Sequence, residues 1–236
     1  IFILTFISRY VVNFIKPFYF NSDTYFHLAC ATQIRDNNFR LPKRAGKLLL
    51  PGAYTYPPLF HFILTLFKNK KGREEFSKVW GPFIDSVIIS ISALFLFPLF
   101  GNQNEVLKYL LILCLIFHPG YVGTAVGPRA FSGTPRILAE LLHLISFLLL
   151  WNFQITGNYG FYFAAIFIAG LGLLSSKFFA QIILFFSIIM AFINQSVLLF
   201  FFPIFAMLIS TIISKGHYLK IFSDQIGHLT LYFKKL

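Results

Sequence analysis

Charged residues are scarce in this chain. Only 12% of its 236 residues are charged, and eight are acidic, whereas about 25% of the residues in soluble domains are charged. Hydrophobic residues make up 57%, and phenylalanine alone occurs 33 times. This composition argues against a water-soluble protein and predicts a polytopic membrane protein.

Several chemistry-bearing motifs are absent. The two cysteines, Cys30 and Cys114, provide neither a disulfide framework nor a metal signature. The sequence contains no P-loop, no nucleophile elbow and no glycine-rich dinucleotide loop. These absences exclude nucleotide-driven pumping within the chain. The lack of an internal repeat also argues against an inverted-repeat transporter.

Basic residues outnumber acidic ones. The formal net charge is +12, from 20 basic and eight acidic residues. In a membrane protein this excess points to anionic lipid headgroups or to phosphate-bearing substrates. Nucleic acid is not expected as a partner, because the bases flank apolar segments and no nucleic-acid-binding motif is present.

The apolar runs predict an all-α, polytopic transmembrane helical bundle, because open strands cannot lie in lipid. About seven segments approach the roughly 20 residues that a spanning helix needs. These segments are residues 1–20, 80–100, 106–118, 137–153, 159–175, 178–193 and 196–214.

We expect these spans to form a single membrane domain over residues 1–236. Residues 1–20 are its first span, and 21–79 form a large polar loop with amphipathic juxtamembrane helices. Residues 80–214 contain the remaining spans, and 215–236 are an interfacial tail. The chain starts within an apolar run and stops at "LTLYFKKL", with no obvious extension after the interfacial segment. We therefore expect a fragment of a longer protein.

The polar loop opens with "NSDTYFHLACATQIRDNNFRLPKR". Ser22 or Asn21 can cap a helix that begins at Asp23, and Asp23 and His27 would then share a face one turn apart. A structural explanation is that the helix dipole favours an acid in the first turn. The functional alternative makes Asp23 a general base at the membrane surface, with His27 orienting it or binding substrate.

Basic and aromatic residues follow in the same loop. Arg35 and the bases after it either anchor the loop to anionic lipids or guide a phosphorylated lipid, since a guanidinium can bind phosphate through two hydrogen bonds. Farther on, "GAYTYPPLFHF" supplies Tyr56 and His61. Its two prolines fix an extended segment and then start a helix. Tyr56 suits either an interfacial aromatic belt or stacking on a sugar.

A second polar insert, "TAVGPRAFSGTPR", precedes the next span. Arg136 and Glu140 are four residues apart, so they can pair and lower the cost of entering lipid, but ionisable groups in spans are also functional candidates. Arg129 and Arg136 can hold a phosphate. Lys177, between two later spans, either snorkels to the interface or contacts a lipid headgroup.

Two charged residues fall in other predicted spans. Arg9 is expected to snorkel from the first span toward an interface. Asp85 lies five residues inside the span that begins at Trp80. It requires a basic partner on another helix, which the sequence does not identify.

The order of these parts resembles the GT-C superfamily of integral membrane glycosyltransferases. The resemblance rests on "SDTYFHLACATQIRDNNFRLP", then "YTYPPLFHFIL", then two spans and a polar loop that opens another span. It covers about residues 1–150 and is a pattern match rather than a close identity. Protein O-mannosyltransferases, lipid A aminoarabinose transferases and the oligosaccharyltransferase catalytic subunit share this organisation.

The resemblance implies a transferase that takes a sugar from a polyprenyl-phosphate carrier and passes it to a glycan, lipid or protein acceptor. Asp23 would be the catalytic base, with His27 beside it, and Arg129 and Arg136 would contact the donor phosphate. Thr24 stands where many relatives have Glu or Pro. The acid nearest the second loop is Glu140, already inside a span, so a two-carboxylate metal site is not expected. No cofactor is firmly implied, although a divalent cation is compatible with the resemblance.

Two arguments predict opposite orientations in the membrane. Loops 21–79 and 119–136 would share one side, which carries nearly all the Lys and Arg, so the positive-inside rule places them in the cytoplasm. The resemblance implies that these loops face the periplasm, the cell exterior or the lumen of the endoplasmic reticulum. We favour the exoplasmic side of a plasma membrane or an endoplasmic-reticulum-type membrane.

Two other classes of function stay open. A transporter or flippase of a lipid-linked glycan would use the same bases for phosphate without chemistry. A noncatalytic membrane scaffold would tolerate substitutions at Asp23 and Arg136. Polar residues in the middle of several spans would favour transport, and they are sparse in this sequence.

Overall fold

The fold is known from a computed structural model that describes residues 1–15, 22–43, 54–100, 105–117 and 133–235. In these ranges the side chains of 12–15, 22–23, 99–100, 117, 228–229 and 231–235 are not described. The described residues form ten α-helices and one short 3₁₀-helix, with no strand among them. The predicted all-α class is therefore confirmed for this part of the chain.

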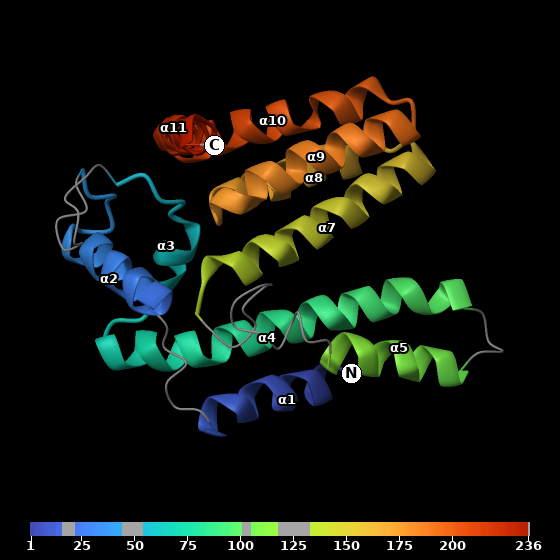
Figure 1. The fold of residues 1–236 in the computed structure, drawn as a ribbon, viewed down its shortest axis with the longest axis horizontal. Helices are drawn as coiled ribbons and strands as arrows, with labels where there is room; N and C mark the ends of the chain where they lie inside the picture. The colour runs from blue at the N-terminus through green and yellow to red at the C-terminus, as the bar shows by residue number, and fades with distance from the viewer. Residues whose placement is uncertain (16–21, 44–53, 101–104, 118–132, 236) are drawn as a thin grey trace. The chain divides into compact units, whose positions relative to one another are not determined.

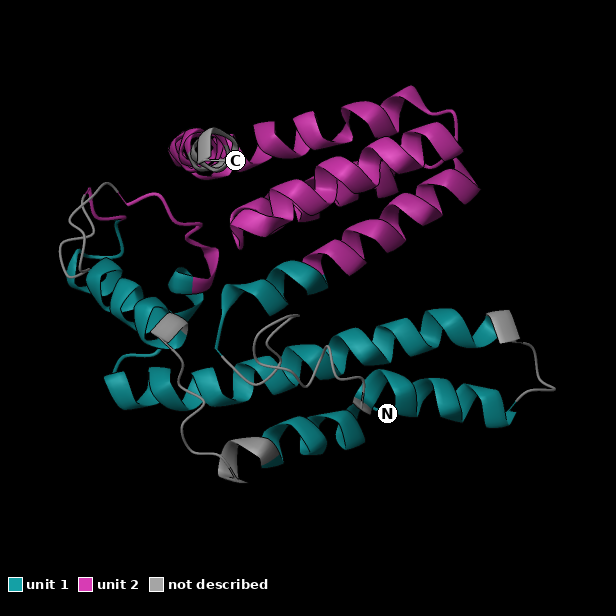
Figure 2. Cartoon of the chain, viewed as in Figure 1, with its two compact units in different colours: residues 1–40, 61–141 teal, residues 41–60, 142–236 magenta. Residues whose placement is uncertain are grey.

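The helices belong to two compact units, a division that the sequence did not suggest (Figures 1 and 2). Unit 1 comprises residues 1–40 and 61–141, and unit 2 comprises residues 41–60 and 142–236. Unit 1 contains α1 (Phe2–Ile15), α2 (Ser22–Asp36), α4 (Lys70–Leu96), η1 (Phe97–Phe100) and α5 (Glu105–Phe117). Unit 2 contains α8 (Tyr159–Leu173), α9 (Lys177–Ile193), α10 (Val197–Ile213) and α11 (His217–Lys235). Helices α3 (Leu59–Thr65) and α7 (Pro135–Thr156) begin in one unit and end in the other.

Two of the described helices, α4 and α7, are long and apolar enough to cross a membrane. Helix α4 begins ten residues earlier than the span predicted at residue 80, because Asn69 caps it: its Oδ1 accepts a hydrogen bond of 2.7 Å from the Gly72 N–H. The basic stretch predicted to be a solvated loop is thus the first part of a 27-residue helix. Helices α9 and α10 have 17 residues each and α8 has 15.

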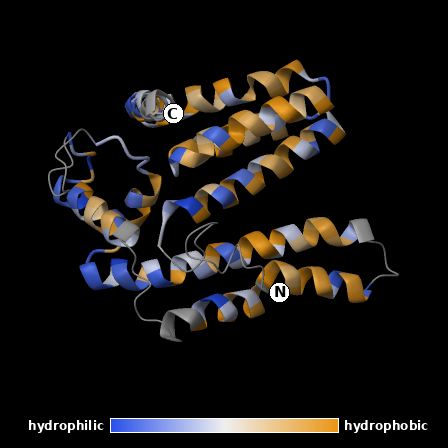
Figure 3. Ribbon diagram, viewed as in Figure 1, coloured by the Kyte–Doolittle hydropathy of each residue, from blue (hydrophilic) through white to orange (hydrophobic). Residues whose placement is uncertain are grey.

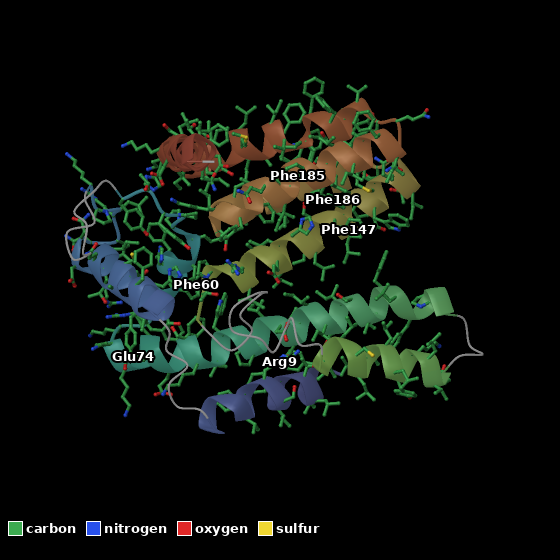
Figure 4. The ribbon with its side chains drawn as sticks, in the orientation of Figure 1. Arg9, Phe60, Glu74, Phe147, Phe185 and Phe186 are labelled. Carbon is green, nitrogen blue, oxygen red and sulfur yellow. The ribbon has the colours of Figure 1, made fainter. Side chains whose placement is uncertain are left out.

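A buried ion pair joins α1 to α4 in unit 1. The Arg9 Nε donates to the Asp85 Oδ2 at 2.8 Å, and the two side chains are 2% and 0% exposed. Arg9 therefore does not snorkel to an interface as expected, and it is the basic partner of Asp85 that the sequence could not identify. Arg9 lies between the two helices in Figure 4.

Apolar contacts complete unit 1. Ile89 and Ala93 of α4 pack against Ile112 and Ile116 of α5, and these four side chains are all buried. Since this core lies farther along α4 than Asp85, α1 and α5 pack at different positions along the same helix.

Small residues let the helices of unit 2 approach closely. A side chain at Gly170 of α8 would lie 2.8 Å from Ile209 of α10, a distance that real side chains avoid. The Ser210 hydroxyl uses this proximity to donate to the Gly170 carbonyl at 2.8 Å. The Tyr162 hydroxyl similarly donates to the Leu198 carbonyl at 2.8 Å. Polar side chains thus tie α8 to α10 in an otherwise apolar bundle.

Short turns connect the successive helices from α8 to α11. Ser176 caps α9, and positive φ angles at Gln195 and Lys215 reverse the chain after α9 and α10. Helix α11 runs across the direction of α8–α10 and is seen end-on in Figure 1. Its Tyr218 and Ile221 are buried at 1% and 0% exposure.

We predict that Arg9→Met or Asp85→Asn alone will destabilise the protein by about 3–5 kcal/mol, because each leaves the other member of a buried pair without its partner. The double variant Arg9→Met, Asp85→Leu should recover most of that loss. The measurement is thermal unfolding in detergent, followed by circular dichroism.

The control is Glu105→Gln. Glu105 pairs with Lys108 at 2.8 Å but is 59% exposed, so its substitution should cost less than about 1 kcal/mol. Single changes that are no worse than the double variant would contradict a pairing role for Arg9 and Asp85.

Candidate functional site

The predicted helix after the first apolar segment is confirmed as α2. It begins at Ser22, so Asp23 lies in its first turn and His27 lies one turn later. The Asp23 side chain is outside the described part of the structure. The placement of the residue nevertheless matches the predicted one, at the N-terminal end of a helix where the dipole favours an anion.

Helix α3 carries the second half of the site. It begins at Leu59, directly after the two prolines that were predicted to start a helix. His61 is 0% exposed on this helix, and His27 is 3% exposed on α2. The His27 Nδ1 and the His61 Nε2 are 2.8 Å apart, so one ring donates a hydrogen bond to the other. The Phe26 ring packs edge-on against both imidazoles.

This histidine pair is uncharged at neutral pH. Burial lowers the pKa of His27 from 6.5 to about 3. Burial, and secondarily the nearby His27, lowers the pKa of His61 well below 6.5. The pair therefore holds α2 against α3 as neutral imidazoles, and neither ring is poised to exchange a proton near pH 7.

Two arginines bind the C-terminal end of α3. The Arg35 Nη1 donates to the Thr65 carbonyl at 2.7 Å, and the Arg73 Nη1 donates to the Phe67 carbonyl at 3.0 Å. The last carbonyls of a helix lack intrahelical partners, and cations are favoured there. Arg35 was predicted to bind substrate, but its described contacts are structural: it fixes the helix that carries His61.

The second predicted polar loop is described only at its end. Arg129 lies outside the described residues. Arg136 and Glu140 lie one turn apart at the start of α7, as predicted, and both are partly buried. Arg136 and Asp85 each lie close enough to Glu140 to act on it electrostatically. Glu140 is therefore part of a charged group in unit 1 that includes the Arg9–Asp85 pair.

Unit 2 contains the two remaining predicted residues. The Lys177 Nζ forms an ion pair with Asp224 of α11 and lies 5.9 Å from the centre of the Tyr56 ring. The Thr55 hydroxyl also donates to Asp224, at 3.2 Å. The His217 ring stacks on Tyr54 at 5.9 Å. Three segments far apart in the sequence thus meet at one end of unit 2.

The predicted site residues therefore divide between the two units. Unit 1 contains Asp23, His27, Arg35, His61, Arg136 and Glu140, and unit 2 contains Tyr56 and Lys177. In the part of the chain that the structure describes, three pairs of predicted site residues come into mutual contact or electrostatic range: His27–His61, Arg136–Glu140 and Tyr56–Lys177. Among the described residues, no group of three or more His, Cys, Asp and Glu side chains is arranged to hold a metal ion.

Sequence reasoning missed Arg73 and Asp224. Arg73 lies in a run of charged residues within the predicted polar loop, where a solvated side chain is expected. In the structure it belongs to α4 and is only 5% exposed. The charge balance could have identified Asp224, which is one of eight acidic residues in a chain with 20 basic ones. Because acids are so few, each of them is expected to pair with a base.

Comparison with known proteins adds no relative. No family model matches the chain, and no curated protein or solved structure is detectably similar to it. The resemblance to GT-C glycosyltransferases therefore rests on the sequence motifs alone and stays a prediction.

We predict that the protein loses stability on acidification because of the histidine pair. The folded-state pKa values lie below the unfolded value of 6.5, so the stability contribution is complete above pH 6.5 and is lost as the pH falls toward 3. The loss amounts to as much as about 1.4 kcal/mol per pH unit for each proton taken up only on unfolding. Unfolding temperatures between pH 7 and 4 measure it.

The matched variants are His27→Asn and His61→Gln, whose amides replace Nδ1 and Nε2 respectively and do not titrate. Each should flatten the acid dependence, whereas Glu75→Gln on the exposed surface of α4 should not flatten it by a comparable amount. An acid dependence as steep in both histidine variants as in the parent would show that the pair is not its cause.

Proposed function

We propose that this protein is an integral membrane glycosyltransferase of the GT-C type. It would transfer a sugar from a polyprenyl-phosphate donor to an acceptor hydroxyl, with Asp23 as the general base. One observation supports this above the others: the hydrogen bond between His27 and His61 joins the two motifs, "SDTYFHL" and "YPPLFHF", on which the resemblance rests.

The surface of unit 2 supports a membrane location. Phe163, Phe185 and Phe192 are 65%, 66% and 78% exposed on α8 and α9, and apolar residues dominate α8–α10 (Figure 3). Phe186, next to Phe185, instead packs 5.3 Å from Phe147 within the unit (Figure 4). In water such outward-facing phenylalanines would be costly, whereas in lipid they are the expected surface.

We further propose that about seven helices cross the membrane. Helices α4 and α7 have sufficient length. A helix of 17 residues, such as α9 or α10, is roughly 26 Å long, somewhat less than the ~30 Å of a typical hydrocarbon core. Local thinning of the bilayer accommodates such short spans at modest cost.

In the proposed reaction, the Asp23 carboxylate takes the proton of the acceptor hydroxyl. The acceptor oxygen bonds to the anomeric carbon of the donor sugar while the bond from that carbon to the phosphate oxygen breaks. The polyprenyl phosphate leaves with the electron pair, and a cation stabilises it. Arg136, with Arg129, is a better candidate for this role than Arg35, whose guanidinium binds the end of α3. The neutral His27–His61 pair positions α2 and takes no proton.

One observation favours a second candidate, a transporter or flippase for a lipid-linked glycan. The Arg9–Asp85 pair and Glu140 place charges inside helices that we propose to cross the membrane, and such charges often mark transport pathways. Reconstituted protein that moves a lipid-linked glycan across liposomes without glycosyl transfer would favour this candidate.

We predict that Asp23→Asn will reduce transfer from a radiolabelled polyprenyl-phosphate sugar by about 10²–10⁴-fold, the usual contribution of a general base. Asp36→Asn, at the opposite end of the same helix, is the matched control and should retain activity. Full turnover by the Asp23→Asn protein would remove Asp23 from the mechanism.

We predict that the first polar loop faces the exoplasmic side. Cys30 is 1% exposed and cannot report on this, whereas Cys114 is exposed, so the background is Cys114→Ser. In that background Asn37→Cys, near the end of α2, should react with an impermeant maleimide on intact cells. Asn194→Cys, in the turn between α9 and α10, should react only after permeabilisation. The reverse pattern would place the loop in the cytoplasm.

A further inference from the structure

Several buried polar side chains in the described part of unit 1 have an atom that makes no hydrogen bond, and three of them lie in adjoining segments. Arg73 and Ser77 of α4 and Thr134, which directly precedes α7, are 5%, 1% and 3% exposed. The atoms concerned are the Arg73 Nε, the Ser77 Oγ and the Thr134 Oγ1. Buried polar groups are nearly always paired in folded proteins, so three such atoms in adjoining segments call for a physical reason.

The three residues adjoin one another at the start of α7. Arg73 and Ser77 are one turn apart on α4 and share a face. A Cβ placed on Gly133 would lie 2.5 Å from the Ser77 Cβ and 2.9 Å from the Ser77 Cα. The backbone next to Thr134 thus packs directly on this face of α4, and only glycine permits that approach.

The unpaired atoms belong to groups that donate hydrogen bonds. The Arg73 Nε carries a proton in a cationic guanidinium, and the Ser77 and Thr134 hydroxyls can each donate one. Thr134 stands where a residue would cap α7, yet its hydroxyl makes no such bond. A helix N-terminus has positive potential and binds anions. Three donors and this helix end suit an oxyanion.

The surrounding charges are mixed but favour an anion. Arg35 lies within electrostatic range of Arg73, as do Asp36 and Glu74. Arg136, the second residue of α7, adds a further cation. Glu140, one turn after Arg136, adds an acid. The three bases and three acids therefore balance, and the partial positive charge at the start of α7 favours an anion.

We infer that Arg73, Ser77, Thr134 and the N-terminal end of α7 form a binding site for a phosphate group. The ligand class is a phosphate mono- or diester, and inorganic phosphate would present the same oxygens. The inference deepens the proposed function, on which it rests for the identity of the ester, since the sugar donor carries such a phosphate.

The structure shows this site closed. The three unpaired atoms have almost no contact with water, so a ligand reaches them only after a local opening of the segments that cover them. The closed form leaves these donors unsatisfied, which lowers stability, and a bound phosphate would recover part of that loss.

Ser77→Ala and Thr134→Val test the site, because each removes only a hydroxyl that has no partner. Without ligand, the purified variants should unfold at the same temperature as the parent or at a higher one. Inorganic phosphate and farnesyl phosphate should raise the unfolding temperature of the parent, by the usual linkage of binding to stability. Each variant should bind them about tenfold or more weakly, because a hydrogen bond to a charged group is lost.

Ser210→Ala is the matched control. The Ser210 hydroxyl donates to the Gly170 carbonyl at 2.8 Å in unit 2, so this variant should be less stable without ligand and should keep the full response to phosphate. Destabilised Ser77→Ala and Thr134→Val proteins, or an unchanged phosphate response in both, would overturn the inference.

Farnesol distinguishes phosphate recognition from tail binding, since a response to farnesol as large as that to farnesyl phosphate would also overturn the inference. A response to both phosphate probes indicates a site for the group itself, and a response to farnesyl phosphate but not to farnesol or inorganic phosphate indicates the lipid ester. These measurements do not depend on glycosyl transfer. A protein that binds phosphate at this site but transfers no sugar would contradict the proposed function and leave the site intact.

Discussion

A polar side chain that is buried among apolar side chains depends on other segments of the chain for its hydrogen bonds, because its apolar neighbours supply none. This constraint fixes many of the contacts that define the two units. The Arg9–Asp85 pair joins α1 to α4, the His27–His61 bond joins α2 to α3, and the ion pair of Lys177 with Asp224 joins α9 to α11. Each contact links segments distant in the sequence, so a few hydrogen bonds specify the packing of otherwise interchangeable apolar helices.

The same constraint explains how much of the fold the sequence could predict. Helix positions followed from apolar runs and from local signals such as the prolines before Leu59, because these depend on neighbours in the chain. The partner of Asp85 and the burial of Arg73 did not follow, because they depend on which helices meet. The start of α4 was missed for a related reason. A run of charged residues is typical of a solvated segment, and only the structure shows that Arg73 donates to the Phe67 carbonyl, two residues beyond the end of α3.

For the candidate site, prediction identified residue types better than roles. His27 and His61 were both identified as candidates, but nothing in the sequence indicated that they contact each other or that burial keeps them neutral. Arg35 was predicted either to anchor the loop to anionic lipids or to guide a phosphorylated lipid. In the structure its guanidinium binds a helix end, where a cation is also favourable. A guanidinium serves either purpose, and only its surroundings separate the two.

The unpaired donors at Arg73, Ser77 and Thr134 gain significance from that contrast. Hydroxyls such as those of Ser210 and Tyr162 form hydrogen bonds that join helices in this chain. The Ser77 and Thr134 hydroxyls form none, and Ala or Val at these two positions would remove them without the loss of a hydrogen bond. Retaining unsatisfied donors lowers stability, and proteins commonly accept such a loss where a ligand is bound. Under the proposed function, these unpaired donors are the feature that most directly connects the fold to a phosphate-bearing substrate.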